Sequence, residues 1–138
     1  MKPYEFEQLV CDHYRQKGYR VQTTSASNDY GIDVFAEKKG EKIAVQVKMY
    51  GGSTRKVNRQ TMMELYGAAA YFDCTKAVLA TDGEVLTDAK EVAHKLGIDI
   101  LFIQPDRKIS MPIWITSSAD RGIRRPKGRR PGLQNIRK

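Results

Sequence analysis

The chain has 138 residues, of which 41% are hydrophobic and 29% charged, a composition that suits one globular domain around a single core. No apolar run approaches the roughly 18 residues that a bilayer-spanning helix needs, and the opening residues MKPYEFEQ lack the apolar core of a secretory signal. Cys11 and Cys74 form no CxxC pair, and two lone thiols fit a reducing compartment. Composition therefore argues against membrane-embedded and disulfide-framed proteins, and it predicts a cytoplasmic protein without a membrane partner.

The formal net charge of +8 is concentrated at the end of the chain. Residues 121–138 contain eight of the 24 basic residues and none of the 16 acidic ones, which leaves the preceding residues formally neutral. Glycines and prolines in this stretch disfavour a regular helix or central strand. We therefore expect a domain over residues 1–120 and a flexible basic tail over 121–138 that contacts nucleic-acid phosphates, with a solubilising or localisation role as the alternative. The tail residues expected to contact phosphates are Arg121, Arg124, Arg125, Lys127, Arg129 and Arg130.

The first predicted element is a helix over residues 3–17. From Phe6 onward, apolar and aromatic residues recur at i, i+3, i+4, i+7 and i+8, which makes one apolar face. Pro3 suits the first helical turn, and Gly18 is a plausible helix end.

Strand and helix patterns alternate along the rest of the chain. The remaining predicted elements are strands over 19–23, 31–38 and 42–50, a helix over 59–72, a strand over 76–81, a helix to residue 96 with Thr87 as its N-cap, a strand over 98–103 and an edge strand over 109–115. An antiparallel hairpin followed by strand–helix–strand crossovers predicts an α/β fold, with a mixed sheet flanked by helices on both faces.

Three polar residues interrupt the apolar pattern of the hairpin NDYGIDVFAEKKGEKIAVQVKMY. Because side chains alternate across a strand, Gln46 and Lys48 share one face, whereas Ile43 and Val45 share the other. Asp33 lies near the start of the preceding antiparallel strand, so we expect it opposite the end of the strand that carries Gln46 and Lys48. A solvated strand face, with Asp33 capping a turn, is the alternative interpretation.

This grouping suits metal-assisted cleavage of phosphodiesters. Mg²⁺ prefers hard oxygen ligands, which the Asp33 carboxylate and the Gln46 carbonyl oxygen can supply, and Mn²⁺ is the expected substitute. Lys48 can orient or deprotonate an attacking water, or stabilise charge on the phosphate. Glu7 is the best second carboxylate, provided that the first helix packs on this sheet.

Basic and aromatic residues around the hairpin are candidates for contacts with backbone phosphates, or else ordinary solvated charge. They are Lys39, Lys42, Tyr50, Arg55, Lys56 and Arg59.

Several ordered segments of the chain resemble the Mrr-like family of restriction endonucleases, within the PD-(D/E)xK nuclease superfamily. EFEQLV resembles the first helix of that family, KGYRVQTT its GY-x-V strand, NDYGIDVFA its D-x-G-I-D segment and VQVKMY its Q-x-K-x-Y strand. Later matches are ELYGA and ATDGEVLTDAKEVAHKLGI, so the resemblance covers roughly residues 3 to 103 and leaves out the basic tail.

The resemblance implies an αβββαβ nuclease core and a metal-dependent DNA endonuclease. Carried over residue by residue, Asp33, Gln46 and Glu7 would hold the metal, and Lys48 would complete the catalytic set. The commoner superfamily pattern has an acid where this chain has Gln46, so the resemblance implies a metal site that depends more on Glu7.

Two alternatives remain open at this point. One is a structure-specific enzyme such as a Holliday-junction resolvase, a class that often dimerises, so a homodimer is among the expected states. The other is a nucleic-acid-binding protein that has the nuclease fold without catalysis. DNA is the expected partner, with RNA as the alternative.

Overall fold

The structure is a computed structural model that describes residues 2–24 and 30–112. The elements of these residues are α1 (Pro3–Gln16), β1 (Arg20–Thr23), β2 (Val34–Lys38), β3 (Glu41–Lys48), β4 (Lys56–Val57), α2 (Arg59–Tyr71), β5 (Lys76–Thr81), β6 (Glu84–Val85), α3 (Thr87–Leu96), β7 (Asp99–Ile103) and β8 (Ile109–Ser110).

A mixed sheet with the strand order β1-β2-β3-β5-β7-β8 forms the centre of the domain. β1, β2 and β3 are antiparallel neighbours, β3, β5 and β7 run parallel, and β8 returns antiparallel to β7. The crossovers that parallel pairing requires contain α2 and α3. The predicted α/β fold with a mixed sheet is therefore confirmed.

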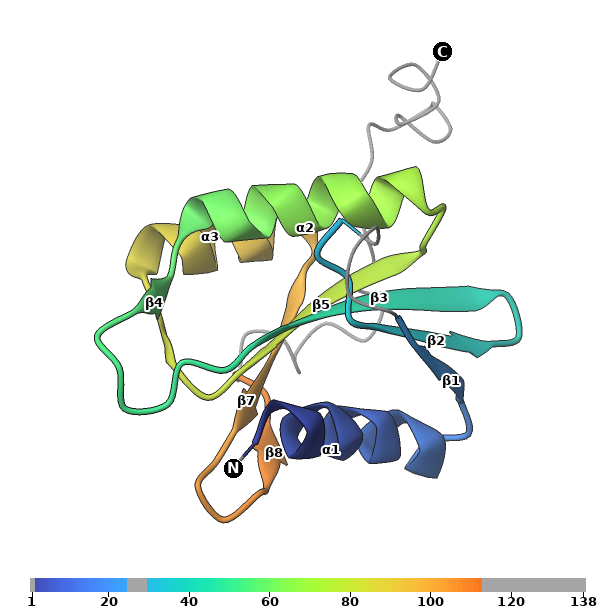
Figure 1. Cartoon of the computed structure of the whole chain (residues 1–138). Helices are drawn as coiled ribbons and strands as arrows, with labels where there is room; N and C mark the ends of the chain where they lie inside the picture. Colours follow the sequence, from blue (N-terminus) through green and yellow to red (C-terminus); the bar gives the residue numbers. More distant parts are fainter. Residues whose placement is uncertain (1, 25–29, 113–138) are drawn as a thin grey trace.

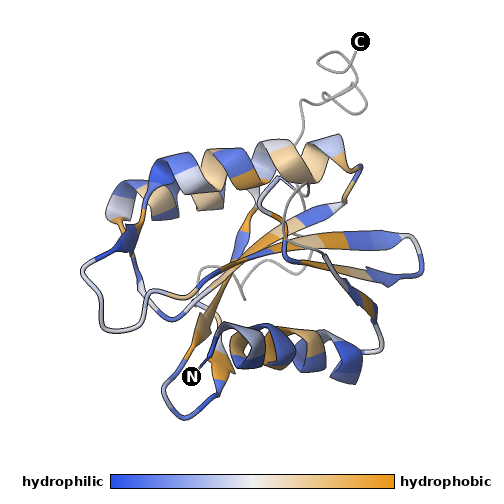
Figure 2. Ribbon diagram, in the orientation of Figure 1, coloured by the Kyte–Doolittle hydropathy of each residue, from blue (hydrophilic) through white to orange (hydrophobic). Residues whose placement is uncertain are grey.

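The helices cover the two faces of the sheet separately (Figure 1). α1 packs on one face through a core that includes Phe6, Val10 and Val45. α2 and α3 pack on the other face, where Leu65 and Ala44 belong to a second core. Figure 2 shows that the central strands are largely apolar, whereas the strand ends and much of the helix surfaces are polar.

β3 alternates between these two cores as the sequence predicts. Ile43 and Val45 belong to the α1 core, and Ala44 belongs to the α2 and α3 core. Gln46 and Lys48 follow Ala44 in the same alternation, so they lie toward the α2 side of the sheet.

β2 and β3 separate before β3 ends. Their last paired residues are Val34 and Val45, whereas β3 continues to Lys48 beside β5. The predicted strand over 31–38 therefore begins three residues late. Tyr30 and Gly31 have φ angles of 52° and 86°, which take the chain out of the extended conformation before Val34.

Two further expectations change at element ends. Thr87 is not the N-cap of α3: Leu86 occupies that position, and its carbonyl accepts the bond from the Lys90 N–H at 3.0 Å. A small parallel sheet of β4 and β6, which was not predicted, comes just before this helix. Because β6 ends at Val85, only Leu86 separates the strand from the first helical residue. Of the edge strand expected over 109–115, Ile109–Ser110 is a strand and residues 111 and 112 are not, whereas residues 113–115 lie outside the described residues.

The described helices include none that is both long and apolar enough to cross a bilayer. The basic tail, residues 121–138, lies outside the described residues, so the proposed division into a domain and a tail stays a prediction.

Candidate active site

Asp33 stands where β2 leaves β3. Its backbone N–H donates to the Val45 carbonyl at 2.8 Å, and its Oδ2 accepts from the Val47 N–H at 2.7 Å. The carboxylate therefore takes the place of a β2 carbonyl at the fork between the strands. On the other side, the Thr24 N–H donates to the Asp33 carbonyl at 3.1 Å, which fixes the backbone of Asp33 to the end of β1.

Gln46 and Lys48 flank Val47, the residue that Asp33 binds. Gln46 is only 8% exposed, and its Oε1 is buried without a hydrogen-bond partner among the described residues. Burying an amide oxygen without a partner is costly, so native proteins seldom leave one without a reason. Lys48 is partly exposed, and its carbonyl accepts from the Thr81 hydroxyl of β5 at 2.7 Å.

Gly31 makes room for the Gln46 amide. A Cβ atom at this position would lie 2.9 Å from Gln46 Nε2, and the φ angle of 86° strains any residue with a side chain. Position 31 therefore needs glycine for two reasons: its positive φ angle and the space that the Gln46 amide occupies.

Glu7 approaches from α1. Burial and, after it, the negative charge of Asp33 raise the pKa of the Glu7 carboxyl above its ordinary value. Two carboxylates that repel each other in this way are stabilised by a divalent cation. The sequence-predicted residues Asp33, Gln46 and Lys48 thus lie at one fork of the sheet, with Glu7 close enough to sense the charge of Asp33.

Asp82 is a residue that the sequence interpretation missed. Its Oδ1 accepts from the Tyr50 N–H at 2.8 Å and from the Gly51 N–H at 2.9 Å, so it fixes the loop that follows Lys48. The same residue helps to line a cavity of about 440 Å³, together with Gly52 and Gln104. The Thr-Asp-Gly sequence comes directly at the carboxyl end of a buried parallel strand, and functional residues are common at this position.

The predicted phosphate-binding residues near the loop differ in what they contact. The Arg55 guanidinium lies over the Tyr50 ring, 4.6 Å from its centroid, so stacking orients this cation beside the loop. Lys39 is exposed in the hairpin turn, with a φ angle of 43°.

The other three predicted cations contact the protein itself. Lys56 lies 3.5 Å from Glu84, and Arg59 lies 3.3 Å from Asp88. Lys42 Nζ donates to the Phe72 carbonyl at 3.0 Å. These contacts do not prevent phosphate binding by Lys56 and Arg59, because exposed ion pairs are weak. The six predicted tail cations lie outside the described residues.

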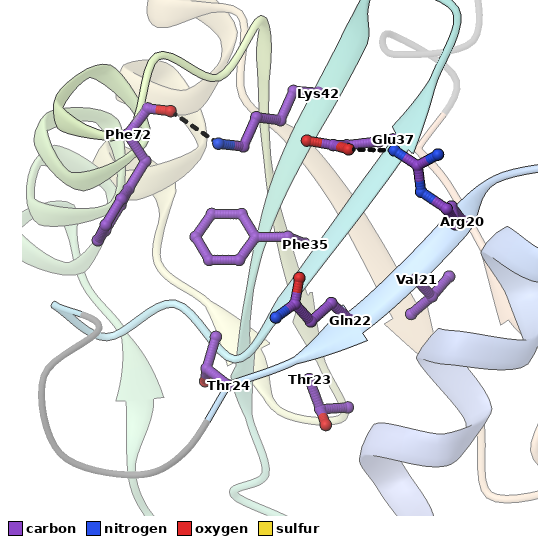
Figure 3. Close-up of a pocket in the computed structure, with 9 residues that line it drawn as sticks. All are labelled: Arg20, Val21, Gln22, Thr23, Thr24, Phe35, Glu37, Lys42 and Phe72. Atoms are coloured by element: carbon purple, nitrogen blue, oxygen red, sulfur yellow. Dashed lines mark hydrogen bonds and ion pairs between the residues drawn. The ribbon is translucent and has the colours of Figure 1, made fainter.

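A second, larger cavity of about 730 Å³ lies over β1 and the hairpin (Figure 3). An ion pair of 2.6 Å between Arg20 and Glu37 closes one side, and Phe35 and Phe72 form its apolar part. None of the four candidate catalytic residues is among its described lining residues, so it is not the candidate active site.

Few side chains that could bind a metal ion lie at the fork between β2 and β3. Among residues 2–24 and 30–112, no group of three or more His, Cys, Asp and Glu side chains could hold a metal ion. The Asp33 carboxylate and the Gln46 amide oxygen have the chemistry that Mg²⁺ prefers, and this ion accepts few protein ligands and keeps several waters. Glu7 belongs to α1, which packs on the other face of the sheet from Gln46, so it would complete the set only around the open end of the fork. The buried, unpartnered Gln46 Oε1 agrees with this fit.

Known proteins share this fold. "Crystal Structure of Protein of Unknown Function AF1548" is similar at a TM-score of 0.56 and 19% identity, over 69% of this chain and 55% of that one. "MspJI Restriction Endonuclease in Complex with 27-mer Oligonucleotide" is similar at a TM-score of 0.51 and 15% identity, over 72% of this chain and 24% of that one. The fold is thus that of the restriction-endonuclease-like nucleases, as predicted.

Sequence comparison identifies the family. A family model, Mrr_cat, described as "Restriction endonuclease", matches residues 1–108. The chain belongs to this restriction endonuclease family, which confirms the resemblance found in the sequence and supports a nuclease function. "Uncharacterized protein y4cE" of Sinorhizobium fredii is 34% identical over 111 residues, which cover 72% of this chain but only 27% of that protein. The chain therefore spans about a quarter of that relative.

Proposed function

We propose that the chain is a metal-dependent endodeoxyribonuclease that hydrolyses phosphodiester bonds at the fork between β2 and β3. The observation that carries the proposal is the buried Gln46 Oε1, which has no hydrogen-bond partner among the described residues. It belongs to the strand segment to which Asp33 is bound through Val47. A buried amide oxygen without a partner, on a strand that also binds a carboxylate, has the chemistry of a ligand for a hard cation.

Asp33, Gln46 and Glu7 would hold Mg²⁺, with Mn²⁺ as a substitute. When bound, the cation supplies Lewis acidity toward a phosphate oxygen and lowers the pKa of a bound water. Asp33 keeps its position because one of its oxygens accepts from Val47, and Glu7 adds the second negative charge. Ionised Glu7 costs free energy beside Asp33, so a cation binds more tightly as Glu7 loses its proton.

Lys48 would act on the substrate rather than on the cation. Lys48 is the last residue of β3, and its ammonium can donate to an attacking water or to the scissile phosphate and offset negative charge in the transition state. The Thr81 hydroxyl donates to the Lys48 carbonyl, and Asp82 accepts from the Tyr50 N–H, so the backbone is held on both sides of this residue.

DNA is the proposed substrate. The solved structure of MspJI, which shares the fold, is described as a complex with a 27-mer oligonucleotide, and this supports the proposal. In this chain, Arg55 stacked on Tyr50, Lys39 in the hairpin turn and the basic tail are the proposed phosphate contacts.

The test is a cleavage panel with the full chain. Supercoiled plasmid, linear duplex, four-way junction and RNA are incubated with Mg²⁺, Mn²⁺, Ca²⁺ or EDTA, using the wild type and the variants Asp33→Asn and Lys48→Ala. We expect DNA cleavage with Mg²⁺ or Mn²⁺ that EDTA and both substitutions abolish. Cleavage that persists in EDTA or in both variants would refute the proposed site, and selective cleavage of junctions would identify a structure-specific enzyme.

A further inference from the structure

Two exposed tyrosines lie side by side at the C-terminal end of α2. Tyr30 is 65% exposed and Tyr71 is 63% exposed, and their ring centroids are 5.1 Å apart. Soluble proteins bury most of the surface of their large aromatic side chains. Two neighbouring exposed rings therefore form a candidate binding surface.

The ring pair is anchored to the core. Phe72 lies 5.0 Å from Tyr71 and 5.8 Å from Tyr30, and on its other side it contacts Phe35 of β2 at 5.3 Å. Tyr30 has a φ angle of 52° and is followed directly by Gly31. The exposed rings are therefore the outer end of a packed aromatic row, so a ligand that stacks on them finds surfaces already in position.

A cavity of about 380 Å³ opens between the two tyrosines and α2. The floor is made of small residues, Gly67 and Ala68, and a Cβ at Gly67 would meet nothing within 4 Å. Glu64 stands at the rim, where its carboxylate accepts from Gln60 at 3.0 Å. The cavity is thus lined mainly by aromatic and small apolar groups, with one acidic residue among its lining residues.

The charge of this cavity excludes a phosphate as its ligand. Its lining residues include Glu64 and no lysine or arginine among the described residues, so a phosphate would be repelled. A nucleobase fits better, because every base offers a face for aromatic stacking, and amino groups such as cytosine N4 donate to carboxylates. Thymine instead presents carbonyl oxygens on both sides of its one N–H, and these oppose Glu64.

The cavity is connected to the candidate catalytic residues through the chain segment that begins at Tyr30. Gly31, the neighbour of Tyr30, lies against the Gln46 amide, and Asp33 follows two residues later. A second copy of the chain is a poorer occupant, because two ring faces and one helical turn provide far less than the roughly 1,000 Å² that a stable interface needs.

We propose that Tyr30 and Tyr71 form a stacking site for one unpaired nucleobase of the DNA strand, with Glu64 favouring bases that carry an amino group. This inference rests on the proposed nuclease function for its substrate class. It predicts that substrates with a bulged, mismatched or single-stranded nucleotide bind more tightly than fully paired duplex.

The experiment measures binding rather than cleavage. Full-length Lys48→Ala protein, chosen to keep the DNA intact, is titrated by fluorescence anisotropy against duplexes that contain one unpaired cytosine, one unpaired thymine or none. We expect the unpaired cytosine to improve affinity about tenfold, on the scale of one base–aromatic stack. The substitution Tyr71→Ala should remove this gain, Tyr71→Phe should retain it, and Glu64→Gln should reduce the preference for cytosine over thymine.

The control is Tyr4→Ala, which removes an equally exposed ring (69%) from α1, on the opposite side of the sheet. Equal affinity for bulged and paired DNA, or the same loss with Tyr4→Ala as with Tyr71→Ala, would overturn the stacking site. A dimer in the absence of DNA that Tyr71→Ala dissociates would assign the surface to a second copy. If the wild type cleaves nothing in any metal yet still discriminates the bulge, the nuclease proposal fails while the stacking site stands.

Discussion

The two edges of the parallel strands β3, β5 and β7 use their polar residues in opposite ways. At the edge where these strands begin, Lys76 lies 3.4 Å from the buried Asp99, and the Lys42 ammonium donates to the Phe72 carbonyl. At the edge where they end, Gln46 Oε1 is buried without a hydrogen-bond partner among the described residues, and burial and Asp33 raise the pKa of Glu7.

The difference separates polar groups that stabilise the fold from those that can bind a ligand. A polar atom that is hydrogen-bonded within the protein contributes to stability. A buried oxygen without a partner reduces the stability, and so does a carboxyl group whose ionised form is disfavoured by burial and by a neighbouring negative charge. In open α/β sheets, ligands bind at the carboxyl ends of the strands, which is the edge where these costs are found. Matched substitutions at the two edges should therefore have opposite effects on activity and stability.

The largest effect is expected for Asp33→Asn. Cleavage should fall by about 10³-fold or more, on the scale of losing a principal electrostatic contribution to the transition state. The thermal midpoint should change little, because an asparagine oxygen can still accept from the Val47 N–H. The matched change Asp99→Asn should lower the thermal midpoint and leave cleavage of the folded protein nearly unchanged. If the two variants lose activity equally, the contrast between the edges is wrong.

Lys48→Ala should reduce kcat by about 10²-fold, the lower range for loss of a positioned proton donor or acceptor. The comparison is Lys76→Ala, which removes the cation beside Asp99 and should act on the free energy of unfolding instead. Single-turnover kinetics and urea unfolding of both variants measure the two quantities. Full activity of Lys48→Ala would remove this residue from the catalytic set.

Gly31→Ala and Gly40→Ala test whether Gly31 serves the site or only the turn. Both glycines have positive φ angles, 86° and 81°, so each substitution should cost about 1 kcal/mol of stability. Only the new Cβ at position 31 meets the Gln46 amide, at 2.9 Å, whereas position 40 is open. Metal affinity by calorimetric titration should fall about tenfold in Gly31→Ala alone. Equal affinities in the two variants would show that Gly31 matters for the backbone only.

The smallest effect concerns Glu7 and pH. Because the folded state raises the Glu7 pKa, it binds this proton more tightly than the unfolded chain does, and stability is lost as pH rises through the folded pKa. Without metal at neutral pH, Glu7→Gln should therefore raise the thermal midpoint, by no more than about 2 °C since Glu7 is only partly buried. The two proteins should converge in acid, and excess Mg²⁺ should reverse their order. A midpoint difference that is independent of pH would contradict this explanation.

Local sequence patterns predicted the elements that depend on local physics. Alternation in β3 placed Ile43 and Gln46 on opposite faces, and the order of elements predicted the mixed sheet. Such patterns could not predict two ion pairs, Lys56 with Glu84 and Arg59 with Asp88. Both ion pairs depend on the parallel contact between β4 and β6, which joins distant parts of the sequence.

The same limit applies to the site. The sequence indicated Asp33, Gln46 and Lys48 as a set, since a hairpin brings its own strands together. It did not indicate that the Asp33 carboxylate would bind Val47, because the early separation of β2 from β3 follows from the positive φ angle of Tyr30. Asp82 was missed for a similar reason: its partners Tyr50 and Gly51 come close only through the pairing of β3 with β5.

The fork between β2 and β3 also determines when the site can exist during folding. Asp33 is positioned by a hairpin of nearby residues, a contact that closes early because its loop is short. Among the described strands, the segment that carries Gln46 and Lys48 pairs only with β5, across a connection that contains the whole of α2. Parallel contacts across such separations form slowly. Activity should therefore return in the last phase of refolding, after most of the helical signal has been regained.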